Sequence, residues 1–466
     1  MTLHLPASEW YAHTEHNPSW HWRLDYPPLT ALHSRLCALL LHHLEPEAVA
    51  LGSSRGYESA LSKLAIRCTV LLSDAFFLLP AIAFACVAAP RQPNARPPQR
   101  LLALALASLF PPQALIDHGH TQFNCVSLGL SLSAACLTLN SRLLFASAAF
   151  TLAFNHKHMA LYFAPAFFSH MLGCCLHKGR IARSWRASVS EVCALASTVL
   201  SATLLCWLPL LVHGPGVALQ ALRQVLPLHR GVFEDYVSNF WCISNTVFDW
   251  EHRFQPSTLA GGSALVTLLC VAPSCALEAI RPTKRGFTRL LFICSLSAFL
   301  FGYQVHEKNI LYPCTAALLL CAESPLLYAH FVLVATFSMV PLLEKDGLMS
   351  ACIALIGLML STLGVCGMLL DNEMMRPFSL HSNVRGRLRL QAALRTARTM
   401  YGSGLVAASC AGCLLLLLLR KLARPPAALP FFHDLAISAF SFAHFVAFLS
   451  LVAIEHFLLV EKRKEE

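Results

Sequence analysis

The sequence predicts an all-α, multi-pass membrane protein, and its composition is the first reason. Hydrophobic residues make up 56% of the chain and charged residues only 13%, with a mean hydropathy of +0.57. Soluble proteins carry about 25% charged residues. The apolar residues also form long runs separated by short polar loops, which is typical of membrane spans. These features exclude an ordinary soluble enzyme, a disordered chain and a nucleic-acid binder, despite a net charge of +10.

About thirteen apolar stretches are candidates to cross a hydrocarbon core of about 30 Å, and several of them are short or bounded by proline. They lie at Ala65–Ala89, Leu101–Leu115, Thr121–Leu139, Leu143–Phe154, Met159–Leu176, Val189–Val212, Thr258–Ile280, Phe287–Tyr303, Asn309–Ala322, Pro325–Leu343, Leu348–Leu369, Gly402–Leu419 and Leu435–Val460.

The distribution of basic residues predicts the orientation. Lysine and arginine collect in cytosolic loops, and they do so here if residues 1–64 lie outside the cytosol. The predicted cytosolic residues are Arg91, Arg96, Arg100, Lys178, Arg180, Arg183, Arg186, Arg281, Lys284, Arg285, Arg289, Arg376, Arg385, Arg387, Arg389, Arg395, Arg398, Lys462, Arg463 and Lys464. The opposite side has scattered basic residues and one poorly fitting loop, with Arg420, Lys421 and Arg424. Simple solvent exposure explains basic loops but not their alternation.

This orientation divides the chain into four parts. Residues 1–64 form a lumenal loop, in which Ala31–Leu44 is short and polar enough to be a helix lying in the interface. Residues 65–322 form a transmembrane core with lumenal motifs, residues 323–460 form further transmembrane helices, and residues 461–466 form a cytosolic tail.

The cysteines predict neither a disulfide framework nor a zinc site. Of 19 cysteines, most lie inside apolar stretches, where cysteine behaves as a small hydrophobic residue. The one Cys-x-x-Cys pair, Cys410 and Cys413, lies inside an apolar stretch and has no second pair to complete a metal site.

Each unusual polar cluster falls on the predicted non-cytosolic side. Asp117, His118 and His120 surround Gly119 in a connection that is either a tight, hydrogen-bonded turn or part of a metal site. His306, Glu307 and Lys308 are consecutive between two apolar stretches, and form either a functional site or a self-neutralising loop tip.

Aromatic residues crowd the N-terminal loop ahead of Pro27. They are Trp10, Tyr11, Trp20, Trp22 and Tyr26. Either they form an aromatic belt at the membrane interface, or they form a sugar-binding surface on which rings stack against carbohydrate C–H groups while Asp25 accepts hydroxyl hydrogen bonds.

Four ordered motifs resemble those of the endoplasmic-reticulum dolichyl-phosphate-glucose glucosyltransferases, which have the GT-C fold. The motifs are LDYPPLTA at Leu24–Ala31, LIDHGHTQFN at Leu115–Asn124, RGVFED at Arg230–Asp235 followed by NFWC at Asn239–Cys242, and QVHEK at Gln304–Lys308. The resemblance covers about residues 5 to 320. It implies an enzyme of N-glycan precursor assembly in the endoplasmic-reticulum membrane, with a lumenal active site and no cofactor.

The resemblance implies a β-linked donor, dolichyl phosphate glucose, and an α-1,3 product on a dolichol-linked oligosaccharide. The reaction therefore inverts the anomeric carbon, and needs a base for the attacking hydroxyl and groups that stabilise the departing phosphate. The residues expected to act are Asp25, Glu234 and His306. The residues expected to bind substrate are Asp117, His118, His120, Arg230, Asp235, Glu307 and Lys308. We expect His306 and Lys308 on the donor, and Asp25 and Glu234 on sugar hydroxyls or the acceptor.

The motif wording favours the enzyme that adds the first glucose to the nine-mannose acceptor over its sister that adds the second. A different class, a transporter or flippase for lipid-linked sugars, stays open. Transporters often have internal repeats and charges at the bilayer midplane, whereas this sequence shows no repeat and has its polar clusters at loop ends.

The start of the chain departs from the family pattern. In the family, a first membrane span and a Gly-Asp motif precede the stretch that begins at Leu3 in this chain. The Asp of that motif is the expected catalytic base. We expect this span and motif to lie before Met1, with Asp25 and Glu15 as substitutes if they do not. At the other end, Lys462-Arg463-Lys464-Glu465-Glu466 resembles a dilysine retrieval signal or is a basic stop after the last span.

Overall fold

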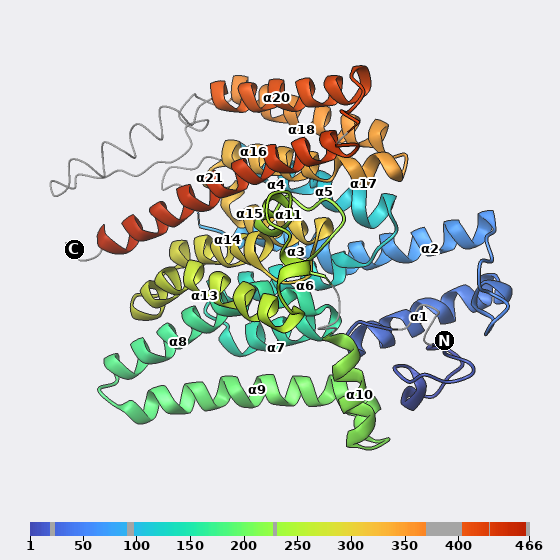
Figure 1. Ribbon diagram of the computed structural model, residues 1–466. Helices are drawn as coiled ribbons and strands as arrows, with labels where there is room; N and C mark the ends of the chain where they lie inside the picture. The colour runs from blue at the N-terminus through green and yellow to red at the C-terminus, as the bar shows by residue number, and fades with distance from the viewer. Residues whose placement is uncertain (19–23, 91–96, 227–230, 370–402, 428, 463–466) are drawn as a thin grey trace. The chain divides into compact units, whose positions relative to one another are not determined.

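The computed structural model describes the whole chain except residues 19–23, 91–96, 227–230, 370–402, 428 and 463–466 (Figure 1). In the described residues, seven helices are long and apolar enough to cross a membrane: Ala60–Ala88, Leu101–Gly119, His158–Ile181, Trp185–Leu211, Pro256–Ile280, Gly404–Leu422 and Phe432–Leu459. Shorter apolar helices lie between them. The predicted class, an all-α multi-pass membrane protein, is confirmed.

The described chain forms two compact units built from interleaved stretches. Unit 1 is 1–81, 116–161 and 175–230, and unit 2 is 82–115, 162–174 and 231–466. The elements within unit 1 are η1 (Ala7–Glu9), α1 (Pro28–Leu44), η2 (Pro46–Val49), α2 (Ala60–Ser73), η3 (Asp74–Leu78), α6 (Asn124–Leu139), α7 (Leu143–His156), α9 (Trp185–Leu211) and α10 (Pro215–Val225).

Unit 2 contains most of the C-terminal half of the chain. Its elements are α4 (Pro97–Leu109), α5 (Pro111–Gln113), β1 (Phe233–Glu234), α11 (Phe240–Asn245), α12 (Trp250–Arg253), α13 (Pro256–Ile280), α14 (Lys284–Phe301), β2 (Val305–His306), η6 (Glu307–Ile310), α15 (Leu311–Cys321), α16 (Pro325–Ser338), α17 (Val340–Lys345), α18 (Met349–Leu369), α20 (Ser403–Leu422) and α21 (Phe432–Lys462). Four elements run from one unit into the other: α3 (Leu79–Ala88), η4 (Ala114–Gly119), η5 (His158–Phe163) and α8 (Ala164–Ile181).

Helices coincide with each predicted apolar stretch, because long apolar segments satisfy their backbone hydrogen bonds internally only as helices or closed barrels. The number that cross a bilayer stays a prediction. The predicted interfacial segment Ala31–Leu44 is also helical, as most of α1.

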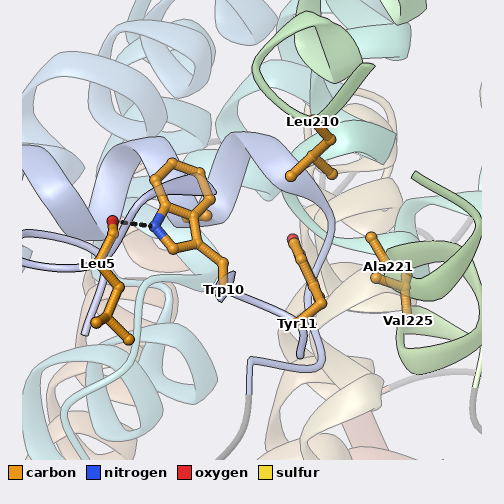
Figure 2. Packing of buried hydrophobic residues seen from close by; sticks show 7 residues of the cluster. Leu5, Trp10, Tyr11, Leu210, Ala221 and Val225 are labelled. Atoms are coloured by element: carbon orange, nitrogen blue, oxygen red, sulfur yellow. Dashed lines mark hydrogen bonds between the residues drawn. The ribbon is translucent and has the colours of Figure 1, made fainter. Parts of the chain in front are cut away.

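The N-terminal aromatics contradict both expectations for Trp10 and Tyr11. These side chains are only 1% and 2% exposed, in a core cluster with residues of α9 and α10 such as Leu210 and Val225 (Figure 2). The indole N–H of Trp10 donates to the Leu5 carbonyl at 3.0 Å, so its polar atom is satisfied inside the cluster. Neither ring belongs to a membrane belt or a sugar surface, because both are buried within the protein. Trp20 and Trp22 lie outside the described residues.

In unit 2, three consecutive helices form the centre. Every residue of α15 and α16 is buried, and so is α14 from Gly286 to Leu300. A helix that is apolar on all sides must be covered on all sides, and α13, α18 and α21 pack against this group.

Arg289, one of the basic residues predicted on the cytosolic side, is buried and not exposed in a loop. Helix α14 already begins at Lys284, so Arg289 lies inside it and is only 6% exposed. Its guanidinium donates to Glu323 at 2.7 Å and to Glu455 at 3.2 Å. These bonds connect α14 to the end of α15 and to α21, and a buried charge needs such partners.

A second buried network holds α8, α13 and α21 together. Glu278 is 0% exposed; its Oε1 lies 2.7 Å from His170 Nδ1 and its Oε2 lies 3.3 Å from His456 Nε2. The backbone N–H of Thr283 also donates to Glu278 Oε1 at 2.7 Å, which positions the start of α14.

Gly129 sets the distance between α6 and the π-helical turn η3. A Cβ at this position would lie 2.5 Å from the carbonyl carbon and oxygen of Phe77 and 2.8 Å from the nitrogen of Leu78. Backbone atoms cannot rotate away, so only glycine allows the two elements to pack this closely.

We therefore expect Gly129→Ala to lower the free energy of unfolding by about 1–3 kcal/mol, the usual cost of overpacking a close contact. Thermal unfolding of the detergent-solubilised protein measures this. The matched control is Gly261→Ala in α13, where no atom lies within 4 Å of the new Cβ and alanine should stabilise the helix by about 0.5–1 kcal/mol. Equal midpoints for the two variants would contradict the packing argument.

Candidate functional site

Two motifs remote in sequence meet through a short parallel strand pair in unit 2. Strand β1 pairs with β2 so that Phe233 lies opposite Val305 and Glu234 lies opposite His306. The backbone N–H of Val305 also donates to the carbonyl of Val232 at 3.3 Å. Because residues opposite each other in a sheet project to the same face, this register places the Glu234 carboxylate beside the His306 imidazole.

His306 lies between two carboxylates. Its Nε2 is 3.7 Å from Glu234 Oε2 and its Nδ1 is 2.5 Å from Glu307 Oε2. The three side chains differ in exposure: 28% for His306, 41% for Glu234 and 5% for Glu307. The accessible edge of the group is therefore formed by Glu234 and His306, with Glu307 behind them as a buried support.

The backbone beside each strand is in an unusual conformation. Asp235, directly after β1, has φ 55°, and Gln304, directly before β2, has φ 57°. Residues other than glycine occupy this left-handed region rarely, and such strain clusters at active sites and ligand clamps. The chain thus turns sharply at both motifs where the strand pair forms.

An aromatic cluster holds the first of these motifs in place. Val232 and Trp241 pack with Leu259, and the indole N–H of Trp241 donates to the carbonyl of Phe301 at 2.9 Å. This bond ties the RGVFED–NFWC segment to the end of α14, just before β2. The NFWC motif therefore has a supporting role, since its tryptophan positions the strand pair.

A charged group surrounds Lys308. Burial lowers the pKa of its ammonium group, and the opposing attraction of Glu307, Asp346, Glu234 and Asp235 favours the charged form. The next residue, Asn309, donates from Nδ2 to the Tyr162 hydroxyl at 3.1 Å. Lys308 is therefore a cation held among carboxylates beside His306.

Unit 1 contains a second polar group, centred on Asp117. This carboxylate is 0% exposed, and accepts from Asn124 Nδ2 and from the backbone N–H of Cys125, each at 2.6 Å. Both donors belong to the first turn of α6, whose N–H groups lack partners within the helix. Asp117 thus stabilises the start of α6. The local hydrogen bonds expected of a turn are present, but Asp117 itself lies in the π-helical segment η4 and not in a tight turn.

Lys157 connects this group to the LDYPPLTA motif. Its ammonium donates to Asn124 Oδ1 and lies 5.5 Å from the centre of the Tyr26 ring, within the range of a cation–π contact. The Thr30 hydroxyl donates to the carbonyl of His156. Asp25, partly buried, precedes Tyr26 and so lies beside this network.

His118 faces a carboxylate that the sequence analysis did not single out. His118 Nε2 is 3.2 Å from Asp74 Oδ2, and Asp74 is only 4% exposed. Asp74 begins the π-helical turn η3, and π-helical turns are frequent at functional sites. The sequence signal for Asp74 was a single carboxylate within the apolar stretch Ala65–Ala89. The signal for Lys157 was a lysine on the predicted non-cytosolic side, which has few basic residues.

The predicted site residues thus form two groups. Glu234, Asp235, His306, Glu307 and Lys308 come together in unit 2, and Asp25, Asp117, His118 and His120 belong to unit 1. Arg230 lies outside the described residues. Among the described residues, no group of three or more His, Cys, Asp or Glu side chains is arranged to hold a metal ion.

Apolar helices of spanning length, together with an imidazole between two carboxylates next to strained loop positions, are typical of an integral-membrane enzyme. Comparison with known protein families makes this specific. The model of the ALG6, ALG8 glycosyltransferase family matches residues 1–451, and the chain belongs to this family.

Curated relatives agree with this assignment. Over 462 residues the chain is 36% identical to the chicken (Gallus gallus) dolichyl pyrophosphate Man9GlcNAc2 alpha-1,3-glucosyltransferase, covering 96% of this chain and 87% of the relative. The mouse (Mus musculus) protein of the same name is 38% identical, with 96% and 87% covered. A probable Arabidopsis thaliana enzyme of that name is 40% identical, with 75% and 64% covered.

Because Asp117 pairs with two buried donors, we expect Asp117→Asn to destabilise the protein. The amide presents an N–H₂ group to an N–H donor and leaves one donor unpaired, which costs about 1–3 kcal/mol. Thermal unfolding in detergent measures the change. The control Glu58→Gln alters an exposed carboxylate paired only with Lys63 and should leave the midpoint unchanged. An unchanged midpoint for Asp117→Asn would refute a structural role for its charge.

Proposed function

We propose that this protein transfers glucose from dolichyl phosphate β-glucose to the lipid-linked nine-mannose oligosaccharide, forming an α-1,3 linkage. The observation that carries the proposal is the β1–β2 register, which aligns Glu234 with His306. Family membership and the names of the relatives support the same reaction.

The reaction is a single displacement with inversion. The 3-hydroxyl oxygen of the acceptor sugar attacks C1 of glucose, the bond from C1 to the phosphate oxygen breaks, and dolichyl phosphate leaves with the electron pair. The hydroxyl proton passes to a carboxylate base. No covalent enzyme intermediate forms.

In this scheme the unit 2 group holds the donor. Lys308 and an N–H of His306 offset the charge on the departing phosphate, and they do so more strongly in a partly buried site than in water. Glu307 fixes the His306 ring from behind, with its Oε2 2.5 Å from Nδ1. Glu234 is exposed enough to accept hydrogen bonds from sugar hydroxyls.

In unit 1, the partly exposed candidates are His118, His120 and Asp25. Asp117 is fully buried, so its contribution to substrate binding is indirect, through the position of the loop that carries His118 and His120. Asp74 fixes the His118 ring as Glu307 fixes that of His306, with Asp74 Oδ2 3.2 Å from His118 Nε2.

We also propose that the site faces the lumen of the endoplasmic reticulum. The predicted orientation puts the basic-rich segments in the cytosol and the motifs on the other side. Part of the excess of basic residues on the predicted cytosolic side lies in the segment 371–401 and the tail 463–466. Both lie outside the described residues.

We expect His306→Ala to abolish glucose transfer, because the variant loses the imidazole between Glu234 and Glu307. The measurement is transfer from dolichyl phosphate glucose to lipid-linked Man9GlcNAc2 in microsomes, with insertion checked by alkaline extraction. The matched control is His252→Ala, which removes a side chain that is 87% exposed and paired with Asp249 on the surface. Full activity of the His306 variant would refute the assignment.

Acceptor choice separates the first-glucose enzyme from its sister. We expect purified protein to glucosylate lipid-linked Man9GlcNAc2 and to leave the monoglucosylated acceptor unchanged, measured by chromatography of the released glycans. The reverse preference would establish the second-glucose enzyme. Product formed in detergent, without sealed vesicles, would exclude a transporter because transport needs two compartments.

A further inference from the structure

A cavity in unit 2 borders the His306 group on its buried side. Its volume is about 280 Å³. Its walls come from the loop after β1, from η6, from the end of α16, and from α17, α20 and α21. The residues that matter below are Asp235, Tyr236, Glu307, Arg420, Phe431 and Asp434.

Glu307 lines this cavity with a buried carboxylate. The residue is 4% exposed, and its Oε2 is 2.5 Å from His306 Nδ1. Its Oε1 has no hydrogen-bond partner within the part of the chain that the structure describes. A buried carboxylate oxygen without a donor costs about 1–3 kcal/mol or more, so a ligand that donates hydrogen bonds would satisfy it.

The opposite wall is held by a paired arginine. Arg420 Nε lies 2.6 Å from Glu344 Oε2, and its Nη1 is bonded to Asp434 Oδ1. These contacts connect α20 to α17 and to the start of α21. They also explain Arg420, the basic residue that fitted the orientation rule poorly, since it is a component of this wall and not a free loop charge.

The charge of the lining favours a neutral ligand. The carboxylates are Asp235, Glu307 and Asp434, and the bases are Lys345 and Arg420. With Arg420 already shared by two carboxylates, a phosphate would meet net negative charge. A polyhydroxylated ligand has no such penalty, because its hydroxyls donate to carboxylates and accept from the bases.

Aromatic rings complete the lining. Tyr236 and Phe431 both line the cavity, with ring centres 5.6 Å apart and planes tilted by 40°. Flat apolar ring faces beside carboxylates match the C–H faces and equatorial hydroxyls of a pyranose. The volume lies just below the usual range of about 300–1,000 Å³ for ligand pockets, which suits a single sugar ring.

We propose that this cavity is a hexose subsite, in which Glu307 accepts a sugar hydroxyl and Phe431 covers one face of the ring. The proposal deepens the proposed function and rests on it for the source of the sugar, which is either the donor glucose or a mannose of the acceptor. Glu307 would then connect the sugar in the cavity to the orientation of His306.

Direct binding tests the cavity without requiring activity. Saturation-transfer NMR of the full-length protein in detergent, with methyl α-mannoside and methyl β-glucoside as probes, should show binding of at least one of them. Phe431→Ala should weaken it by about 3- to 10-fold, the equivalent of a lost aromatic contact. Phe432→Ala is the matched control, because Phe432 is a neighbouring ring that is exposed like Phe431 (42% against 60%) but does not line the cavity.

Kinetics then identify the source of the sugar. In Phe431→Ala, a higher KM for the acceptor with unchanged kcat assigns the cavity to a mannose, and a higher KM for dolichyl phosphate glucose assigns it to the donor, since loss of uniform binding raises KM alone. Glu307→Gln should raise the same KM and also lower kcat through His306. Phe431→Leu replaces Phe431→Ala if the latter fails to fold.

The outcomes separate the two proposals. Glycoside binding that Phe431→Ala and Glu307→Gln leave unchanged, in variants with wild-type thermal stability, overturns the hexose subsite even if the wild type transfers glucose. Binding that depends on both residues in a protein that transfers no glucose supports the subsite and overturns the proposed function.

Discussion

A charged group buried in an apolar protein must have a partner, and this constraint organises the structure. Arg289 lies between Glu323 and Glu455, and Glu278 lies between two histidines. Removing one member of such a group would leave an unpaired buried charge, which costs about 3–5 kcal/mol. Because the partners lie on different helices, each network also determines which helices pack together. In a chain with 13% charged residues, these few polar contacts supply specificity that apolar surfaces alone lack.

The same constraint shapes the candidate site. Asp117 is satisfied by the first turn of α6, whereas Glu307 has an ion-pair contact from Oε2 to His306 and no hydrogen-bond partner for Oε1 among the described residues. The first carboxylate therefore supports the site from within the protein. The second has spare capacity to accept a hydrogen bond and faces a cavity. Motif residues that look alike in sequence thus separate into supports and candidate ligand contacts according to whether their hydrogen bonds are complete.

Some residues in and beside the motifs act as supports. Trp241 ties its segment to α14 through Phe301, and Lys157 joins Tyr26 to Asn124. Such positioning residues hold a site only as precisely as their own hydrogen bonds are held. This explains why whole motifs such as RGVFED–NFWC and LIDHGHTQFN are needed to place a few side chains.

The sequence by itself determined the fold class and the helices, because apolar stretches of spanning length leave the backbone no alternative to helix. The motif residues were also identifiable from the sequence, and their resemblance to known motifs indicated the family. Only the tertiary structure decided their roles. The β1–β2 register that pairs Glu234 with His306, the burial of Trp10 and Tyr11, the partners of Asp74 and Arg289, and the cavity beside Glu307 all depend on contacts between segments far apart in the chain. Secondary-structure propensity and hydropathy describe one segment at a time, so neither predicts which distant segments come into contact.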